Sequence, residues 1–289
     1  MDFIKVGSRG YLFTWMEPYR TNVYVIIGEK QVFVIDTFLG NEPMEELNNK
    51  LDEEGIQCKS YVVFNTHADY DHYWGNRAFS ESLIISHEQV LRRINSQGKE
   101  PLIKFQEYMK GEVKITPPNL TFRKHIVFTR EGVEFFHTPG HTGDSSSCFD
   151  RVDRVLLPGD NLEAPYPYVN LLNLKDYVQS LEEYDKLDMR FIIPGHDPLQ
   201  TNKKLLKKNL DYIKAVAVNQ VNIESMNKRE LSAHLPNLNR LAELYGEKGD
   251  KIKSSDYFRQ TLAVIDLLDH SIENNKLKEQ ISLKLAAIR

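Results

Sequence analysis

Residues 66–76 read Thr-His-Ala-Asp-Tyr-Asp-His-Tyr-Trp-Gly-Asn, and the other motifs of the chain are arranged around this stretch. It comes shortly after residues 61–64, Tyr-Val-Val-Phe, an apolar run typical of a buried β-strand. Two histidines and two carboxylates fall close together in it: His67, Asp69, Asp71 and His72. Imidazole suits zinc and iron, whereas carboxylates suit harder cations. The stretch therefore predicts a loop at a strand end that binds a divalent transition metal.

Three later apolar runs end in a similar way. The dipeptide Pro-Gly follows each of them, and the next residues are His141, Asp160 and His196. Proline fixes φ and glycine permits a sharp turn, so each loop can leave its strand abruptly and present the following side chain. Sites in sheet proteins with covering helices commonly lie in loops beyond strand ends. The recurrence favours a metal site over a polar surface loop that happens to contain two histidines.

Composition is that of an ordinary globular protein. The chain has 289 residues, of which 41% are hydrophobic and 27% charged, enough for one large domain or a large domain with an appendage. No stretch approaches the roughly 18 apolar residues of a membrane span. The amino terminus lacks the basic-then-apolar profile of a secretory signal. Cys58 and Cys148 are too few for a disulfide framework, and as reduced thiols they predict a cytoplasmic protein.

The sequence pattern changes at about residue 201, from one typical of strands to one typical of helices. Before it, short apolar runs predict strands, and the runs at 23–27 and 32–35 predict a hairpin. After it, helical patterns begin, at 203–218, 228–235, 238–245 and from 276 onward. A further helix is indicated by the apolar stripe Phe258, Leu262, Ile265 and Ile272. We expect an α/β domain at 1–202 followed by a helical extension at 203–289.

The order of the motifs resembles that of the metallo-β-lactamase superfamily. The similarity covers roughly residues 10–200 and rests on His67-x-Asp69-x-Asp71-His72, followed by His141, Asp160 and His196. Asp36 and the run Thr-Pro-Gly-His-Thr at 138–142 match two further motifs. The resemblance implies an α/β fold, a four-layered αββα sandwich, with the metals at one edge between the two sheets.

The resemblance also implies a role for each motif residue. His67 and His141 bind the first metal, while Asp71, His72 and His196 bind the second. Asp160 bridges both, and Asp36 holds the loop and its histidines in place. Two such metals share a hydroxide, the implied nucleophile, and stabilise the developing oxyanion. Asp71 and Asp160 are thus the predicted catalytic residues, and no serine or cysteine is required.

Asp69 departs from the hydrolytic members of this family, which usually have a histidine there. A carboxylate makes the first site harder and more anionic, and this favours iron or manganese. The change resembles the flavodiiron proteins, which carry glutamate at that position, although nothing after residue 200 looks like their flavodoxin domain. We expect two divalent ions, with zinc favoured and iron or manganese as the alternatives that Asp69 introduces.

Three functions are compatible with this sequence. The leading hypothesis is a metal-dependent hydrolase that uses a metal-bound hydroxide on an ester, thioester, lactone or phosphoester. The alternative is a di-iron protein that reduces oxygen or nitric oxide. A non-catalytic binding or assembly protein is the third, and the full ligand set argues against it. Trp74, Tyr166 and Tyr168 are candidates for a substrate pocket, with core packing as their other interpretation.

Charge is distributed unevenly along the chain. Residues 203–289 hold 16 Lys and Arg against 11 Asp and Glu, whereas the whole chain has 37 against 41. The basic extension could dock on the acidic body or on a neighbouring subunit, forming a homo-oligomer. It could equally be a polyanion-binding surface, or a solvated lysine-rich face. A small-molecule substrate is expected, and neither nucleic acid nor a membrane is. We interpret the remaining histidines as packing or surface residues: His87, His125, His137, His234 and His270.

Overall fold

The computed structural model describes residues 1–56, 60–268 and 271–288, so Cys58 and His270 lie outside the described residues. The chain forms two compact units. The first comprises Met1–Pro139, Asp144–Asp160 and Lys186–Lys203, and the second comprises Gly140–Gly143, Asn161–Asp185 and Lys204–Arg289. The division at residues 202 and 203 into a catalytic domain and an extension stays a prediction.

A seven-stranded sheet forms one half of the first unit. Its strands follow the order of the chain, antiparallel from β1 to β4 and parallel from β4 to β7. The predicted hairpin is present, with Tyr24 opposite Ile35. The strands are β1 (Asp2–Val6), β2 (Gly10–Trp15), β3 (Thr21–Ile27), β4 (Val32–Ile35), β5 (Tyr61–Phe64), β6 (Leu83–His87) and β7 (Leu120–Phe122).

A five-stranded sheet with the order β12-β11-β10-β9-β8 forms the other half. Its strands are β8 (His125–Phe128), β9 (Val133–His137), β10 (Ser146–Asp150), β11 (Val155–Gly159) and β12 (Phe191–Pro194). β11 and β12 run parallel, with Gly159 paired to Pro194. Because both strands end at the same edge, the residues that follow them, Asp160 and His196, are brought close together.

The two sheets pack face to face around an apolar core. The rings of Phe64 and Phe135, one from each sheet, stack with their centroids 4.1 Å apart and an interplanar angle of 4°. Both side chains are fully buried. Burying a phenylalanine contributes roughly 1.5–3 kcal/mol to stability relative to leaving it exposed. This core holds together the strands whose ends carry the polar loops.

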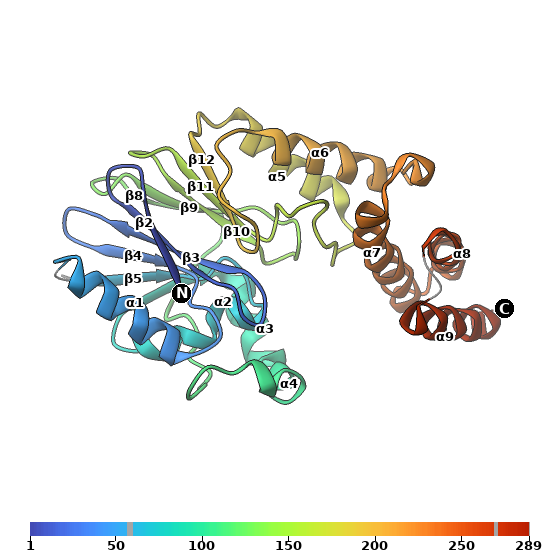
Figure 1. Ribbon diagram of the computed structural model, residues 1–289, viewed down its shortest axis with the longest axis horizontal. Helices are drawn as coiled ribbons and strands as arrows, with labels where there is room; N and C mark the ends of the chain where they lie inside the picture. Colours follow the sequence, from blue (N-terminus) through green and yellow to red (C-terminus); the bar gives the residue numbers. More distant parts are fainter. Residues whose placement is uncertain (57–59, 269–270, 289) are drawn as a thin grey trace. The chain divides into compact units, whose positions relative to one another are not determined.

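Helices cover the outer face of the seven-stranded sheet (Figure 1). α1 (Asn41–Glu53) buries Met44 and Leu47 there, and α3 (Glu88–Gln97) buries Val90 and Ile94. The first unit therefore has the layers helix, sheet and sheet. The remaining helical segments of this unit are short: α2 (Tyr70–Tyr73), η1 (Trp74–Phe79), α4 (Lys99–Lys104) and η2 (Gln106–Tyr108).

The helices of the second unit begin within the first two hundred residues. They are α5 (Leu174–Lys186), α6 (Lys204–Ala217), η3 (Ile223–Ser225), α7 (Lys228–Glu247), α8 (Lys251–Leu267) and α9 (Ile272–Ile288). Two boundary predictions were wrong. α7 continues through Pro236, where two helices were expected, because Pro236 and Ser232 are exposed and water can satisfy the carbonyl that proline leaves unbonded. The stripe expected on one helix is divided between α8 and α9.

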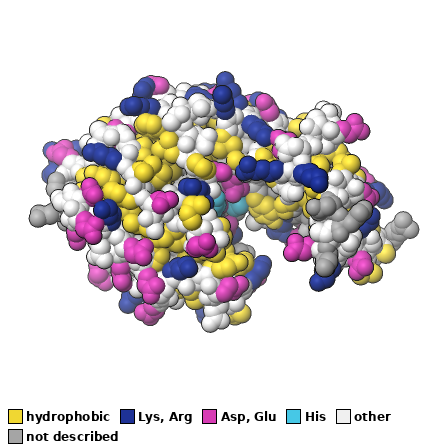
Figure 2. Space-filling model, in the orientation of Figure 1, with side chains coloured by type: hydrophobic (Ala, Val, Ile, Leu, Met, Phe, Trp, Pro, Cys, Tyr) yellow, Lys and Arg dark blue, Asp and Glu magenta, His cyan; other side chains and the backbone are white. Residues whose placement is uncertain are grey.

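Several charges of the helical extension are paired within the second unit. Lys208 lies 2.6 Å from Glu230, Lys214 lies 2.7 Å from Glu182, and Lys284 lies 2.7 Å from Glu243. On the face shown in Figure 2, basic and acidic side chains are interspersed. No helix in the described part of the chain is long and apolar enough to cross a membrane.

Candidate metal centre

Asp36, which follows β4, holds the loop that follows β5. Its Oδ1 accepts a hydrogen bond from the backbone amide of Thr66 at 2.8 Å, and its Oδ2 accepts one from Thr66 Oγ1 at 2.9 Å. The same Oδ2 lies 2.8 Å from Nδ1 of His72. β4 and β5 are neighbouring parallel strands, so the carboxylate reaches across from one strand end to the next. One buried side chain thereby fixes both the start of the loop and the ring of His72.

Four side chains at the ends of three strands converge on one point, which we call the second metal position. They are Asp71 and His72 after β5, Asp160 after β11 and His196 after β12. Oδ2 of Asp160 lies 3.4 Å from Nε2 of His72 and 3.2 Å from Nε2 of His196. Nε2 of His196 lies 3.4 Å from both Nε2 of His72 and Oδ2 of Asp71.

These spacings test whether the residues fit a metal ion. Ligand atoms at about 2.0–2.1 Å from a tetrahedral ion lie about 3.3 Å from one another. The distances among Asp160, His72 and His196 are within about 0.2 Å of that value. Asp71 lies farther from His72, at 3.9 Å. The donor atoms are two imidazole nitrogens and two carboxylate oxygens, so both geometry and chemistry fit a divalent transition metal.

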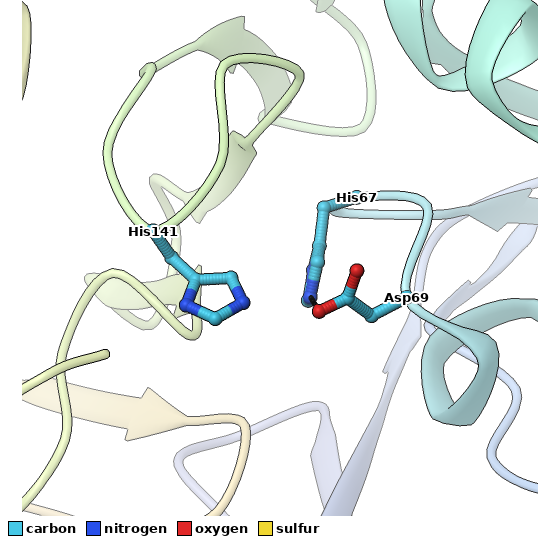
Figure 3. A group of neighbouring side chains, drawn as sticks. All are labelled: His67, Asp69 and His141. Atoms are coloured by element: carbon cyan, nitrogen blue, oxygen red, sulfur yellow. Dashed lines mark ion pairs between the residues drawn. The ribbon is translucent and has the colours of Figure 1, made fainter. Parts of the chain in front are cut away.

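The first metal position lies beside it and shares one of its atoms. Nε2 of His67 lies 3.5 Å from Oδ2 of Asp160 and 3.5 Å from Oδ2 of Asp69. Figure 3 shows His67 and Asp69 pointing toward each other from one loop, with a dashed line for their ion pair. Oδ2 of Asp160 therefore faces the histidines of both positions, as a bridging ligand would.

Hydrogen bonds determine which nitrogen of each ring carries the proton. Nδ1 of His196 lies 2.7 Å from the carbonyl oxygen of Arg20, which can only accept. Thr66 Oγ1 gives its hydrogen to Asp36, so it accepts from Nδ1 of His67 at 3.0 Å. When Nδ1 is protonated, the lone pair of a neutral ring is on Nε2. The neighbours thus direct Nε2 of these histidines toward the metal positions, an arrangement typical of metal-ligating histidines.

The second oxygen of Asp160 gives a further indication. Oδ1 is buried and has no hydrogen-bond partner among the described residues. A Cβ atom on Gly195 would lie 2.1 Å from this oxygen and 3.1 Å from Cε1 of His72. Glycine is therefore required here because the backbone just after β12 passes against the site. A buried carboxylate oxygen normally has a partner, and a bound cation can take that role.

The buried carboxylates of the site require positive charge nearby to stay ionised. Burial raises the pKa of Asp160, but His196, His72 and His67 outweigh it and hold that pKa well below its usual range. Burial and His72 lower the pKa of His67, but Asp69 and Asp160 prevail and raise it to about 9. Burial likewise lowers the pKa of His196, and Asp160 raises it to about 10. Protons or a divalent cation can supply the charge that these carboxylates require.

His141 belongs to the second unit and comes from the loop after β9; Figure 3 labels its side chain as well. Within that unit its backbone amide donates to Oδ1 of Asn161 at 2.7 Å. Its Nδ1 lies 3.1 Å from the carbonyl oxygen of Tyr168, and its own carbonyl accepts from the amide of Asn170 at 3.0 Å. The ring is thus held in the same Nδ1-protonated form as that of His196.

The three residues predicted as candidates for a substrate pocket, Trp74, Tyr166 and Tyr168, make the following contacts. Trp74 is 1% exposed and packs in the core between helices and sheet, in agreement with its core-packing interpretation, and a role in a substrate pocket stays a prediction. Tyr166 stacks on Tyr212 with ring centroids 3.9 Å apart, inside the second unit. The ring of Tyr168 lies 5.9 Å from that of His141.

Sequence reasoning missed three residues that touch the metal loop. Arg93 of α3 pairs with Asp69 and, at 3.2 Å, with Asp144. Oδ2 of Asp144 accepts the backbone amide of Ala68 at 3.0 Å. The hydroxyl of Tyr19 donates to Oδ2 of Asp71 at 3.0 Å. None belongs to a local motif, and their partners are 24 to 76 residues away, so no spacing pattern could have found them.

Comparisons with known proteins agree with this architecture. The sequence model described as "Metallo-beta-lactamase superfamily" matches residues 16–196. A curated relative, "Acyl-coenzyme A thioesterase MBLAC2" of Bos taurus, is 22% identical over 228 residues, which cover 69% of this chain and 81% of the relative.

Solved structures of similar fold include a metallo-β-lactamase from Pontibacter korlensis. It has a TM-score of 0.58 and 19% identity, and the match covers 74% of this chain and 98% of that one. The metallo-β-lactamase FIM-1 from Pseudomonas aeruginosa, in a mono-zinc form, has a TM-score of 0.61 and 14% identity. That match covers 75% of this chain and 96% of the other. These likenesses confirm the expected sandwich fold, which implies divalent metal binding.

Proposed function

Since this chain belongs to the metallo-β-lactamase superfamily of hydrolases, we propose that it is a metal-dependent hydrolase of thioesters. The observation that carries the proposal is the position of Asp160. One buried oxygen of this residue lies 3.2–3.5 Å from Nε2 of three histidines, His67, His72 and His196. Such a cluster of buried donors favours a metal centre over a set of packing contacts.

The motif residues divide between two metal positions. We assign Asp71, His72 and His196 to the second position and His67 with Asp69 to the first, with Asp160 shared between them. His141 is assigned to the first position from the order of the motifs. When bound, divalent metals supply an activated water near neutral pH and stabilise the charge that develops on a carbonyl oxygen. Zinc is the metal we favour, with iron and manganese as the alternatives.

The chain's own residues keep these donors in place. Asp36 and the Arg20 carbonyl set the rings of His72 and His196. The Tyr19 hydroxyl donates to Oδ2 of Asp71, so the carboxylate that faces His196 is also fixed. Preorganised donors need no rearrangement when charge develops, which is the main contribution a protein makes to such catalysis.

The substrate class is supported by the curated relative. Its printed name is that of an acyl-coenzyme A thioesterase, and the match spans most of both chains. A thioester also suits the chemistry, because its carbonyl is activated and its thiolate leaves readily. Esters, lactones and phosphoesters are the other substrate classes that the same donors could serve.

The test is hydrolysis of acyl-coenzyme A thioesters of increasing chain length, with release of free thiol as the readout. The full-length protein is loaded separately with zinc, iron or manganese, and oxygen esters and a phosphodiester serve as competing substrates. We expect thioester turnover, and we expect His72→Ala and Asp160→Asn to remove both metal and activity. His125→Ala is the matched control, because this histidine is partly exposed and pairs with Glu134.

The outcomes separate the hypotheses. If the protein hydrolyses oxygen esters or phosphodiesters but not thioesters, the proposed hydrolase activity stands and the proposed substrate class is rejected. Two irons in protein purified without added metal, together with oxygen or nitric oxide reduction, would favour the redox alternative. Equal metal content in wild type and Asp160→Asn would reject the bridging role of Asp160.

A further inference from the structure

The carboxylate of Asp69 stands where relatives of the hydrolytic type usually have an imidazole, and its two oxygens face different partners. Oδ1 forms an ion pair with Nη2 of Arg93. Oδ2 lies 3.5 Å from Nε2 of His67, at the first metal position. The orientation of this carboxylate therefore depends on a residue from another element, α3.

Arg93 is itself held firmly. Its neighbours Val90 and Ile94 are buried under the seven-stranded sheet, so the helix that carries the guanidinium is anchored. Its Nη1 lies 3.2 Å from Oδ1 of Asp144, whose side chain is 5% exposed. Oδ2 of Asp144 accepts the amide of Ala68, the residue between His67 and Asp69. The guanidinium fork thus connects to the metal loop twice, through the side chain of Asp69 and through Asp144.

Charge gives a second reason to assign a role to this pair. Replacing an imidazole by a carboxylate adds one negative charge at a site where Asp160 already faces the same nitrogen of His67. Arg93 places a positive charge on the far oxygen of Asp69 and offsets that addition. Both side chains are about three-quarters buried, with 29% of Arg93 and 26% of Asp69 exposed, so solvent screens the pair less than it would at the surface.

We propose that Arg93 is a positioning residue of the metal centre: it turns Oδ2 of Asp69 toward the first metal position and offsets its charge. Asp69 and Arg93 then act together in place of a single imidazole. The inference rests on the proposed metal centre, and it concerns the first position alone. The other interpretation is an ordinary ion pair that stabilises the loop and leaves metal binding unchanged.

The test is metal binding by the full-length protein, measured by chelator competition with zinc and with manganese, independently of any substrate. Arg93→Met removes the charge and keeps most of the length. We expect it to weaken the first-position ion by about 10–100-fold, as loss of a residue that orients a ligand does, and to leave the ion at Asp71, His72 and His196 unchanged. Arg93→Lys keeps the charge without the fork, so we expect partial recovery.

Two further variants make the result specific. Arg92→Met is the matched control, because Arg92 is the preceding residue of the same helix, is 70% exposed and pairs with Glu88 at 3.4 Å. It should leave both ions bound as in wild type. In an Asp69→His background, Arg93→Met should weaken the first-position ion less than it does in wild type, because an imidazole needs no guanidinium to offset it and only the connection through Asp144 is lost.

Each outcome decides the question. Unchanged binding of both ions by Arg93→Met, or equal weakening of both, would overturn the positioning role while the proposed hydrolase stands. A loss from Arg93→Met in the Asp69→His background as large as that in wild type would also overturn it. If wild type binds two ions and Arg93→Met loses the first, the inference holds even where no thioester is hydrolysed. A wild-type protein that binds no metal would reject the metal centre and this inference together.

Discussion

His72 receives its orientation from Asp36, whose Oδ2 lies 2.8 Å from Nδ1 of the ring, although 36 residues separate the two. Asp36 has φ at 63°, in the left-handed region that L-residues seldom adopt. Aspartate and asparagine tolerate this region better than most residues. The strain is located at the residue that carries three hydrogen bonds to the metal loop, as is common at functional sites.

We predict that Asp36→Asn weakens metal binding at the second position by about 10–100-fold. Asparagine keeps the backbone tolerance and the size, but its amide nitrogen cannot accept the hydrogens of Thr66 or His72. Chelator competition on the full-length protein measures the change. Asp153→Asn is the matched control, since Asp153 also accepts backbone amides, from Ser8 and Arg9, far from the loop along the chain. If Asp36→Asn binds the metal as tightly as wild type, Asp36 is not needed to hold His72 and the metal loop in place.

A methyl group added at Gly195 tests whether Asp160 must keep its position for metal binding. A Cβ atom there would lie 2.1 Å from Oδ1 of Asp160, much closer than any real contact. We predict that Gly195→Ala displaces Asp160 and reduces binding of both ions, because Asp160 faces both positions. Gly246→Ala should retain metal, since its Cβ would meet only Ser254, at 3.2 Å. Full metal content in Gly195→Ala would show that the carboxylate can move without leaving the ions.

Much of this site was predictable because its donors are carried in local motifs. His67, Asp69, Asp71 and His72 follow one strand directly, and Asp160 and His196 follow two adjacent parallel strands. The strands themselves were predictable from short apolar runs. Arg93 and Asp144 were not, because their pairing depends on how α3 packs over the sheet. Pro236 misled the helix prediction for a related reason: its tolerance depends on exposure, which only the folded structure reveals.

His234 should make stability depend on pH. Nδ2 of Asn237 donates to the hydroxyl of Tyr212, which therefore donates its own hydrogen to Nδ1 of His234 at 2.9 Å. This nitrogen must stay unprotonated, and burial lowers the pKa of His234 to about 4. A group whose pKa is lowered on folding contributes stability that is present above its unfolded pKa and is lost as the pH falls.

We therefore predict that wild type loses stability relative to His234→Gln as the pH falls from about 6.5, the unfolded pKa, toward 4. Glutamine can accept the Tyr212 hydrogen and does not titrate. The free energy of unfolding of wild type, taken relative to that of His234→Gln, should fall by about 1 kcal/mol between pH 6 and pH 5. Urea unfolding at each pH measures it, and the comparison with the variant cancels the other histidines. A difference that stays constant with pH would contradict the prediction.

α7 supports His141 through the side chain of Asn237. Asn237 is fully buried; its Oδ1 accepts the amide of Val169 at 2.8 Å, and its Nδ2 donates to the carbonyl of Pro167 at 2.9 Å. Between these two anchors, the Tyr168 carbonyl accepts from Nδ1 of His141. The helical extension thus fixes the backbone that orients a predicted ligand, within one unit of the structure.

If His141 binds the first ion, as the order of the motifs predicts, Asn237→Ala should weaken that ion selectively. The free amide and carbonyl at 167–169 would rearrange, and the His141 ring would lose its fixed direction. Asn239→Ala is the matched control, because Asn239 lies on the same helix and its side chain bonds Glu243 at 3.3 Å. Chelator competition measures metal binding and thermal unfolding measures stability. Together they separate a specific loss of His141 orientation from a general loss of stability. A variant that is less stable but binds both ions as tightly as wild type would make α7 a packing element without influence on the metal centre.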